Sequence, residues 1–209
     1  MRRRGDNRDM QSIQCRTFIL LGLSLVIDCN HVYSQHPATP LEPSPAFATS
    51  KLSGTDVDAL VAFHNKARAE VESPPVRWSP KLASYAQAWA DHLAAMGKLK
   101  HRPPEGEGSL PYGECVAAGS SIEFSAVDGA KGWYAEKENY EPGTPIPADI
   151  TMWKAGHYTQ MAWSTTREIG AGRAVIAQGE MQGWTVIVCN YDPPGNAEGE
   201  LPYPLPPTK

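Results

Sequence analysis

The sequence KAGHYTQMAWSTT, residues 154–166, places a histidine, a tyrosine, a threonine, a glutamine and a tryptophan within a run of eight residues. The spacing predicts a helix that begins at Gly156 and carries His157, Gln160 and Met161 on one face. A histidine in the first turn lies near the positive end of the helix dipole, which favours the neutral ring that binds metals. A buried core histidine would show the same spacing, so partners for His157 must come from the rest of the chain.

The N-terminal segment predicts export. Residues 1–16 are rich in arginine, and Thr17–Ile27 is an apolar run of eleven residues. The residues that follow suit a signal peptidase, so we predict a secretory signal peptide over residues 1–34. Eleven apolar residues are too few to cross a bilayer. Two alternatives stay open, which are Met10 as the true start and a lipoprotein anchor at Cys29.

The charge balance argues against nucleic acid as a partner. The chain has 19 basic and 23 acidic residues, and removing the 5 basic and 3 acidic residues of the predicted signal peptide leaves 14 and 20, a net charge of −6. No basic stripe remains in the mature chain. We expect an extracellular protein, periplasmic if bacterial, that is a monomer without a transmembrane span.

Two of the four cysteines, Cys115 and Cys189, lie outside the predicted signal peptide. Two cysteines in an exported protein usually pair. Such a bond would close a loop of about 75 residues and stabilise the fold by about 4 kcal/mol in the chain-entropy model. Two buried thiols are the alternative.

Three helices are predicted in the first two thirds of the mature chain. Thr55 with Asp58 resembles a capping box, and Pro74–Pro75 ends that helix. Ser79–Pro80 then starts a second helix, which Gly97 closes. A third helical pattern covers residues 126–140.

The remaining pattern predicts strands and a tail. Ile169–Ile176 and Trp184–Tyr191 are strand-like, and a glycine turn between them predicts an antiparallel hairpin. Helices first and strands late indicate an α+β fold, with helices packed on a small antiparallel sheet. We expect residues 35–53 to be a proline-rich linker and residues 54–209 to be one domain that ends in an irregular, proline-rich tail.

Four segments in this order resemble the CAP superfamily of cysteine-rich secretory proteins, antigen 5 and pathogenesis-related 1 proteins, and the pathogenesis-related 1 members most closely. They are FHNKAR (63–68), YGEC (112–115), GHYTQMAWSTT (156–166) and IVCNYDPPGN (187–196). In YGEC, Cys115 stands where the family usually has asparagine. The resemblance covers about residues 55–203 and implies an α-β-α sandwich with an open cleft.

The resemblance also implies a site in that cleft, formed by two histidines and two glutamates. Carried over by motif, these are His101, Glu114, Glu136 and His157, which we call the tetrad. Family members can bind a divalent metal, often zinc, through the two histidines. Glutamates that hold the second ring nitrogens would fix the tautomer, and a site with only two protein ligands should be weak.

Other residues receive roles from the same resemblance. His64, Asn65 and Arg68 are expected to be structural, while Tyr158 and Gln160 are expected to shape the cleft. The six cysteines of the plant branch are absent, and the plant partner position for Cys189 is empty. We therefore predict a replacement disulfide between Cys115 and Cys189.

The resemblance favours a non-catalytic module that binds sterols, other lipids or a cell-surface target, in defence or virulence. The alternative is a metal-dependent hydrolase, such as a peptidase, with Glu114 or Glu136 as general base. No catalytic motif that is independent of fold supports that alternative. A third reading is release of a peptide signal from the tail, since Pro193–Tyr203 resembles the plant segment that is released in this way.

Overall fold

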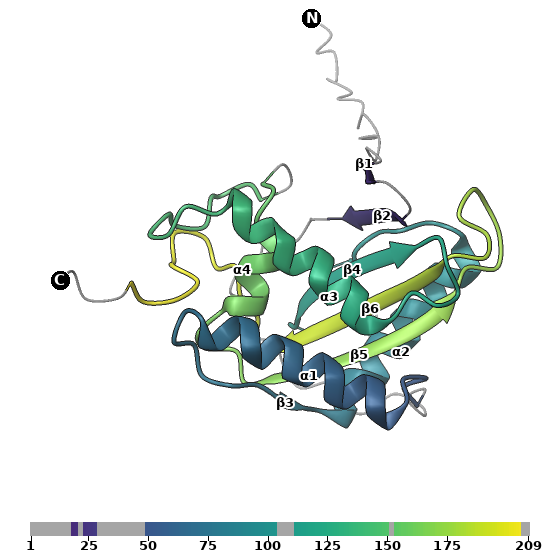
Figure 1. The fold of residues 1–209 in the computed structure, drawn as a ribbon, viewed down its shortest axis with the longest axis horizontal. Coiled ribbons are helices and arrows are strands. Elements are labelled where there is room, and N and C mark those ends of the chain that lie inside the picture. Colours follow the sequence, from purple (N-terminus) through teal and green to yellow (C-terminus); the bar gives the residue numbers. More distant parts are fainter. Residues whose placement is uncertain (1–17, 21–22, 29–48, 104–110, 151–152, 206–209) are drawn as a thin grey trace, which may run out of the picture.

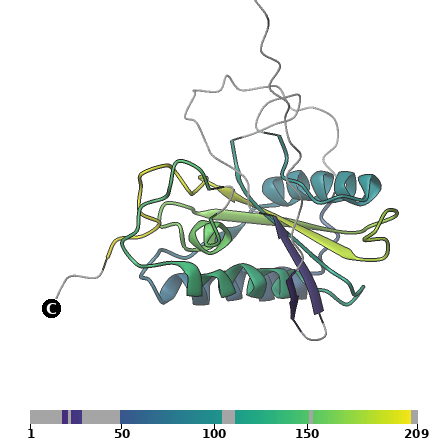
Figure 2. The same ribbon diagram turned by 90° about the horizontal axis from the view of Figure 1, so that it is seen from above.

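The computed structural model describes residues 18–20, 23–28, 49–103, 111–150 and 153–205. Most of the predicted linker and the predicted cleavage site after Ser34 lie outside these residues. A β-sheet separates two helical layers (Figures 1 and 2). Helix α2 (Pro80–Met96) covers one face, and α1 (Gly54–Ala69), α3 (Ala126–Ala135) and α4 (Gly156–Ala162) cover the other. The predicted α-β-α sandwich is confirmed.

The sheet has the strand order β1-β2-β4-β6-β5-β3. Neighbouring strands pair antiparallel from β1 to β5 in this order, whereas β3 pairs parallel with β5. The sheet is therefore mixed, although an antiparallel sheet was predicted. The six strands are Phe18–Leu20, Leu23–Asp28, Arg77–Trp78, Gly113–Gly119, Glu168–Val175 and Thr185–Asp192, from β1 to β6.

Strands β1 and β2 come from the segment predicted to be a signal peptide. Strand β2 pairs with the second half of β4, from Asp28 opposite Val116 to Leu25 opposite Gly119. Cleavage after Ser34, which stays a prediction, would remove both strands and leave β4 at the edge of a four-stranded sheet. No described helix is long and apolar enough to span a bilayer.

The helix boundaries follow local chemistry. Helix α1 begins two residues earlier than predicted, because Ser53 and Asp56 form the capping box that was expected at Thr55 and Asp58. As predicted, helix α2 begins at Pro80 and is closed by Gly97. Gly97 is its C-cap residue, with φ 70°. The third predicted helix is shorter, because α3 gives way to the 3₁₀ turn η1 (Glu136–Asn139).

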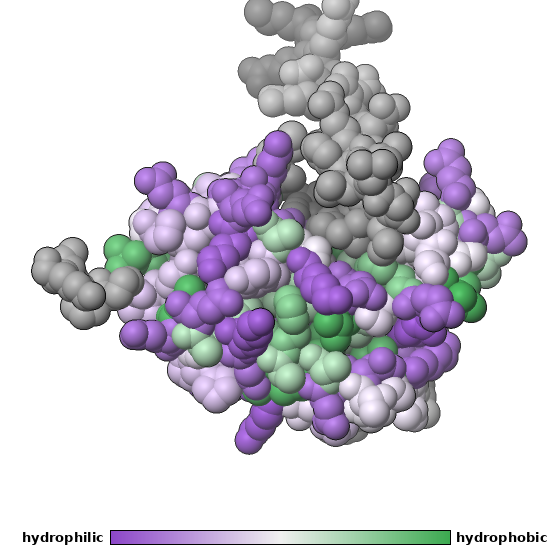
Figure 3. Space-filling model, in the orientation of Figure 1, coloured by the Kyte–Doolittle hydropathy of each residue, from purple (hydrophilic) through white to green (hydrophobic). Residues whose placement is uncertain are grey.

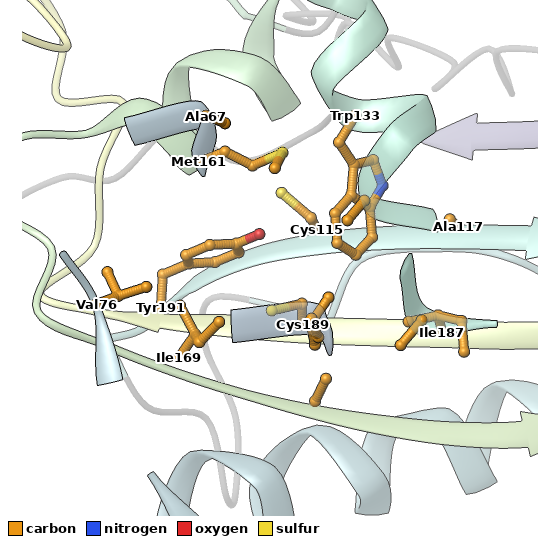
Figure 4. Close-up of a cluster of buried hydrophobic side chains, with 14 of the residues drawn as sticks. Ala67, Val76, Cys115, Ala117, Trp133, Met161, Ile169, Ile187, Cys189 and Tyr191 are labelled. Atoms are coloured by element: carbon orange, nitrogen blue, oxygen red, sulfur yellow. The ribbon is translucent and has the colours of Figure 1, made fainter. Parts of the chain in front are cut away.

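Both faces of the central strands β4 and β6 are buried. On β4, Cys115 and Ala117 join a core cluster that includes α1 and α3 residues, while Val116 and Ala118 join a cluster with α2. This double burial explains why the β6 segment reads as a nearly continuous apolar run. Figure 4 shows the first cluster, in which Trp133 and Met161 lie over the sheet.

The FHNKAR segment is structural, as the resemblance implied. The buried guanidinium of Arg68 donates to the carbonyls of Met161, Trp163 and Thr166 over 2.8–3.0 Å, and to that of Pro74 at 2.7 Å. Four carbonyls around one fixed cation join α1 to the C-terminal end of α4.

The disulfide predicted between Cys115 and Cys189 is not formed in the structure, which holds both residues as thiols. The register still brings them together, since Cys115 lies directly opposite Cys189 on β4 and β6. Both are fully buried beside Tyr191 in the same core cluster (Figure 4). The structure therefore shows the alternative state of two buried thiols, at positions that are neighbours in the sheet.

Two glycines of β5 let α2 pack closely on the sheet. A Cβ on Gly172 would overlap the Gln87 backbone, and one on Gly170 would overlap the backbone of Ala83. We expect Gly172→Ala to lower the free energy of unfolding by about 3 kcal/mol, because α2 must move away from β5. Gly54→Ala is the matched control, since a Cβ there meets nothing within 4 Å. Urea denaturation of both variants checks this, and equal stabilities would contradict it.

His64 gives the stability a pH dependence. Burial lowers its pKa from 6.5 to about 4. Because the folded pKa lies below the unfolded one, this contribution is complete above about pH 6.5. It falls by about 3 kcal/mol as the pH drops towards 4. We expect His64→Gln to flatten the pH dependence of the unfolding free energy in that window, while exposed His92→Gln keeps the wild-type slope. If the unfolding free energies of wild type and His64→Gln change equally with pH in that window, His64 is not the source of the pH dependence.

Candidate functional site

The first half of the tetrad joins the segment after α2 to the start of β4. His101 Nδ1 lies 2.9 Å from Glu114 Oε1, which also accepts the backbone N–H of Arg102 at 3.0 Å. The side chains of His101 and Glu114 are 7% and 5% exposed. A carboxylate that binds both the ring and the next backbone amide fixes the position of His101.

Arg102 holds this segment against α2. Its guanidinium lies 3.7 Å from the centre of the Tyr85 ring and 5.0 Å from that of Trp89, and it donates to the Tyr85 carbonyl at 2.7 Å. Cation–π contacts of this kind stabilise a partly buried guanidinium. Arg102 was not among the predicted site residues, although its place directly after His101 was a signal.

The second half of the tetrad joins η1 to α4. Glu136 Oε1 lies 2.8 Å from His157 Nδ1, and Glu136 Oε2 accepts the backbone N–H of His157 at 2.8 Å and that of Tyr158 at 3.4 Å. The N-cap residue of α4 is Ala155, which has no side chain that can cap the helix. Glu136 supplies that cap from another element and orients the ring at the same time.

His157 is buried, at 2% exposure, and its ring stacks on Trp133 with 6.2 Å between the centroids and 19° between the planes. The sequence analysis missed this contact, because nothing in the sequence links position 133 to position 157. Trp133 in turn donates weakly to the Val116 carbonyl of β4, at 3.4 Å. The ring of His157 is therefore held by Glu136 at its edge and by Trp133 on its face.

The two pairs share one chemistry. An ionised carboxylate only accepts hydrogen bonds, so Nδ1 carries the proton in each neutral ring and Nε2 is the nitrogen with the lone pair. This tautomer suits a metal ligand. Glu114 Oε2 is a buried acceptor with no hydrogen-bond partner among the described residues. Two neutral imidazoles fit the ligand preferences of zinc.

The tetrad is formed as two pairs. Within the described ranges, no group of three or more His, Cys, Asp or Glu side chains is arranged to hold a metal ion. All four side chains are at most 12% exposed. A metal bound here would therefore depend on ligands beyond the two histidines, such as water.

Tyr158 and Gln160, expected to shape a cleft, connect α4 to the tail. Gln160 Oε1 accepts the N–H of Gly195 at 2.9 Å, and the Tyr158 hydroxyl lies 3.2 Å from that of Tyr203. Burial raises the pKa of Tyr158 well above its usual value. Asn196, which the sequence analysis did not single out, donates to the Gly156 carbonyl at 2.8 Å.

Because Glu136 caps α4 and orients His157, its loss should destabilise the fold as well as the site. We expect Glu136→Ala to lower the free energy of unfolding by about 3 kcal/mol, since charged hydrogen bonds to two backbone amides and a buried ring disappear. Glu138→Ala, which removes an exposed carboxylate from the same 3₁₀ turn, should cost little. Chemical denaturation compares the two, and an equal loss in both would contradict the capping role.

Solved structures share this architecture. The structure of BmVAL-1 superposes with a TM-score of 0.62 at 24% identity, covering 75% of this chain and 85% of that one. NaASP2 with Zn²⁺ gives a TM-score of 0.60 at 21% identity, covering 73% and 86%. At these identities the likeness shows the fold alone.

Sequence relatives are closer. Pathogenesis-related protein 1A of Nicotiana tabacum is 38% identical over 140 residues, which cover 67% of this chain and 76% of that protein. A pathogenesis-related protein of PR-1 type from Sambucus nigra is 36% identical over 143 residues, covering 68% and 79%. The model of the cysteine-rich secretory protein family, CAP, matches residues 61–191. The chain therefore belongs to the CAP family and is similar to its pathogenesis-related 1 members.

Proposed function

We propose that this CAP protein is secreted and non-catalytic, and that its tetrad holds a divalent metal, most suitably zinc, through His101 and His157. The observation that carries the proposal is the matched pair of contacts from Glu114 and Glu136 to the Nδ1 atoms of the two rings, at 2.9 and 2.8 Å. These contacts select the tautomer that a metal requires. Zn²⁺ is named in the structure of NaASP2, which has the same fold.

A bound metal would polarise its water ligand and act as a Lewis acid. The chain's own residues would position the two histidines and limit the access of water. Glu114 and Glu136 orient the rings, and Trp133 restricts the ring of His157. Since the tetrad side chains are largely buried, they exclude most bulk water from the histidines.

The same contacts favour binding over catalysis. Both oxygens of Glu136 are engaged, by the His157 ring and by the first amides of α4, so this carboxylate cannot accept a proton without weakening the helix cap. The hydrolase alternative would therefore depend on Glu114, whose Oε2 has no partner among the described residues. That single oxygen is the specific observation in favour of the alternative.

We propose a sterol, another lipid or a cell-surface target as the partner, in a defence or virulence role. The face formed by α1 and α3 offers apolar surface, which Figure 3 shows as green atoms near the centre of the view. Partly buried apolar side chains of these helices, which include Val61, Phe63 and Val127, pack there against the core. Sterols bind through apolar contact of this kind.

Release of the tail as a peptide is a weaker proposal, because residues between Gly195 and Pro202 are bound to the rest of the domain. Gly195 and Asn196 hydrogen bond to α4, and the amide of Ser164 donates to the Pro202 carbonyl at 2.7 Å. The backbones of Ile146 and residues 199–200 also bond to each other at 2.9 Å. A cut near Pro193 would leave the segment held by these contacts.

The metal proposal predicts that zinc binds the wild-type protein and that His157→Ala weakens this binding by about a hundredfold, because a ligand nitrogen is lost. His92→Ala is the matched control, since His92 is an exposed histidine outside the tetrad that stacks on Trp89. Isothermal titration calorimetry measures both, with circular dichroism as a check of folding. Equal zinc affinity in folded His157→Ala and wild type would refute the site.

The binding and hydrolase readings separate in a second assay. We expect labelled sterol to bind wild type and His157→Ala alike, because the apolar side chains proposed for this contact, such as Val61, Phe63 and Val127, are not members of the tetrad, and we expect no cleavage of a peptide library with zinc present. Zinc-dependent cleavage that Glu114→Gln abolishes, without any lipid binding, would instead support the hydrolase.

A further inference from the structure

Cys115 and Cys189 form a possible modification site that the proposed function does not use. They lie directly opposite each other on β4 and β6, on the face of the sheet that packs against α1 and α3. Opposite residues in antiparallel strands have Cα atoms about 4.5–5.5 Å apart, which lies within the range that disulfides span. Figure 4 shows the two side chains beside the Tyr191 hydroxyl.

The two sulfurs lie in a mainly apolar core cluster beside that hydroxyl, and Cys189 Sγ lies 4.0 Å from the Asn190 carbonyl oxygen. His64 Nδ1 lies 2.9 Å from the Leu60 carbonyl, which can only accept, so Nδ1 carries the proton. His64 Nε2 then accepts the Tyr191 O–H across 3.0 Å. Burial and the neighbouring thiols raise the pKa of Tyr191 well above its usual value, so the hydroxyl stays neutral.

The native core gives an oxidant no access to this pair. Both cysteines have 0% exposure. Disulfide exchange requires a thiolate that can reach the oxidant. Burial raises the pKa of Cys189 to about 12, so its thiolate fraction at pH 7 is roughly one in 100,000. Strands β4 and β6 pair over the full length of β4, from Gly113 to Gly119, so exposing the sulfurs requires opening the sheet.

We propose that Cys115 and Cys189 are a redox pair whose state is fixed when the chain folds, as a disulfide in an oxidising compartment and as two thiols in a reducing one. With a disulfide oxidant such as oxidised glutathione, one cysteine thiolate attacks the oxidant and releases one reduced glutathione. The second thiolate then displaces the other glutathione. Two thiols become one disulfide, and the oxidant takes up the two electrons and two protons as two reduced thiols.

Whether the pair is a disulfide or two thiols in the cell rests on the proposed secretion. That folding fixes the redox state of the pair does not depend on it. The test therefore uses purified full-length chain made under reducing conditions. One portion is treated with oxidised glutathione in native buffer, and the other is treated in guanidinium chloride and then refolded. Peptide mass spectrometry follows only the Cys115 and Cys189 peptides, so that Cys15 and Cys29 do not contribute.

We expect the Cys115–Cys189 disulfide to form in the unfolded sample at least about a thousandfold faster than in the native one. Cys115→Ala, the matched control, should yield no internal bond in either sample. If the native sample is oxidised at nearly the rate of the unfolded one, folding does not fix the redox state. If no Cys115–Cys189 bond forms in either sample, the two cysteines are not a redox pair. The purified chain could form the bond only when unfolded, as expected, while material from the cell contains only thiols. That result would contradict the proposed secretion into an oxidising compartment but not the redox pair itself.

Discussion

The carboxylate of Glu136 connects the fold to the tetrad. It caps α4, whose own N-cap residue is an alanine, and it binds the ring of His157 in the first turn of that helix. One side chain thus satisfies backbone amides that would otherwise be buried without partners, and it selects the tautomer of His157. A site built on this contact inherits the rigidity of the core, because every residue of α4 is buried.

The other end of α4 has the opposite charge arrangement. Arg68 binds the carbonyls of Met161, in the last turn of the helix, and of Trp163, its C-cap, so an anion lies at the N-terminus and a cation at the C-terminus. The tail adds contacts along the helix, through Gly195 and Asn196. Seven residues are too few for a stable isolated helix, so these partners account for its formation. Arg68 thereby joins the FHNKAR segment to residues 154–166.

The sequence predicted those features that depend on local chemistry. Pro80 and Gly97 mark the ends of α2, and the motif resemblance named the four residues of the tetrad, although the structure alone shows which glutamate contacts which histidine. Features that depend on long-range pairing were missed or wrong. The parallel pairing of β3 and the stack of Trp133 on His157 have no local signature. A disulfide was predicted between Cys115 and Cys189, whereas the structure holds them as thiols opposite each other, because oxidation depends on the compartment and not on the pattern.

The central claim is that two separately held histidines form one metal site. The most direct measurement is the anomalous scattering at the zinc edge from crystals of the protein grown with zinc. The account predicts one peak within bonding distance of Nε2 of both His101 and His157, with Glu114 and Glu136 still bound to the Nδ1 atoms. A peak on only one histidine, or no peak at the tetrad at saturating zinc, would contradict it.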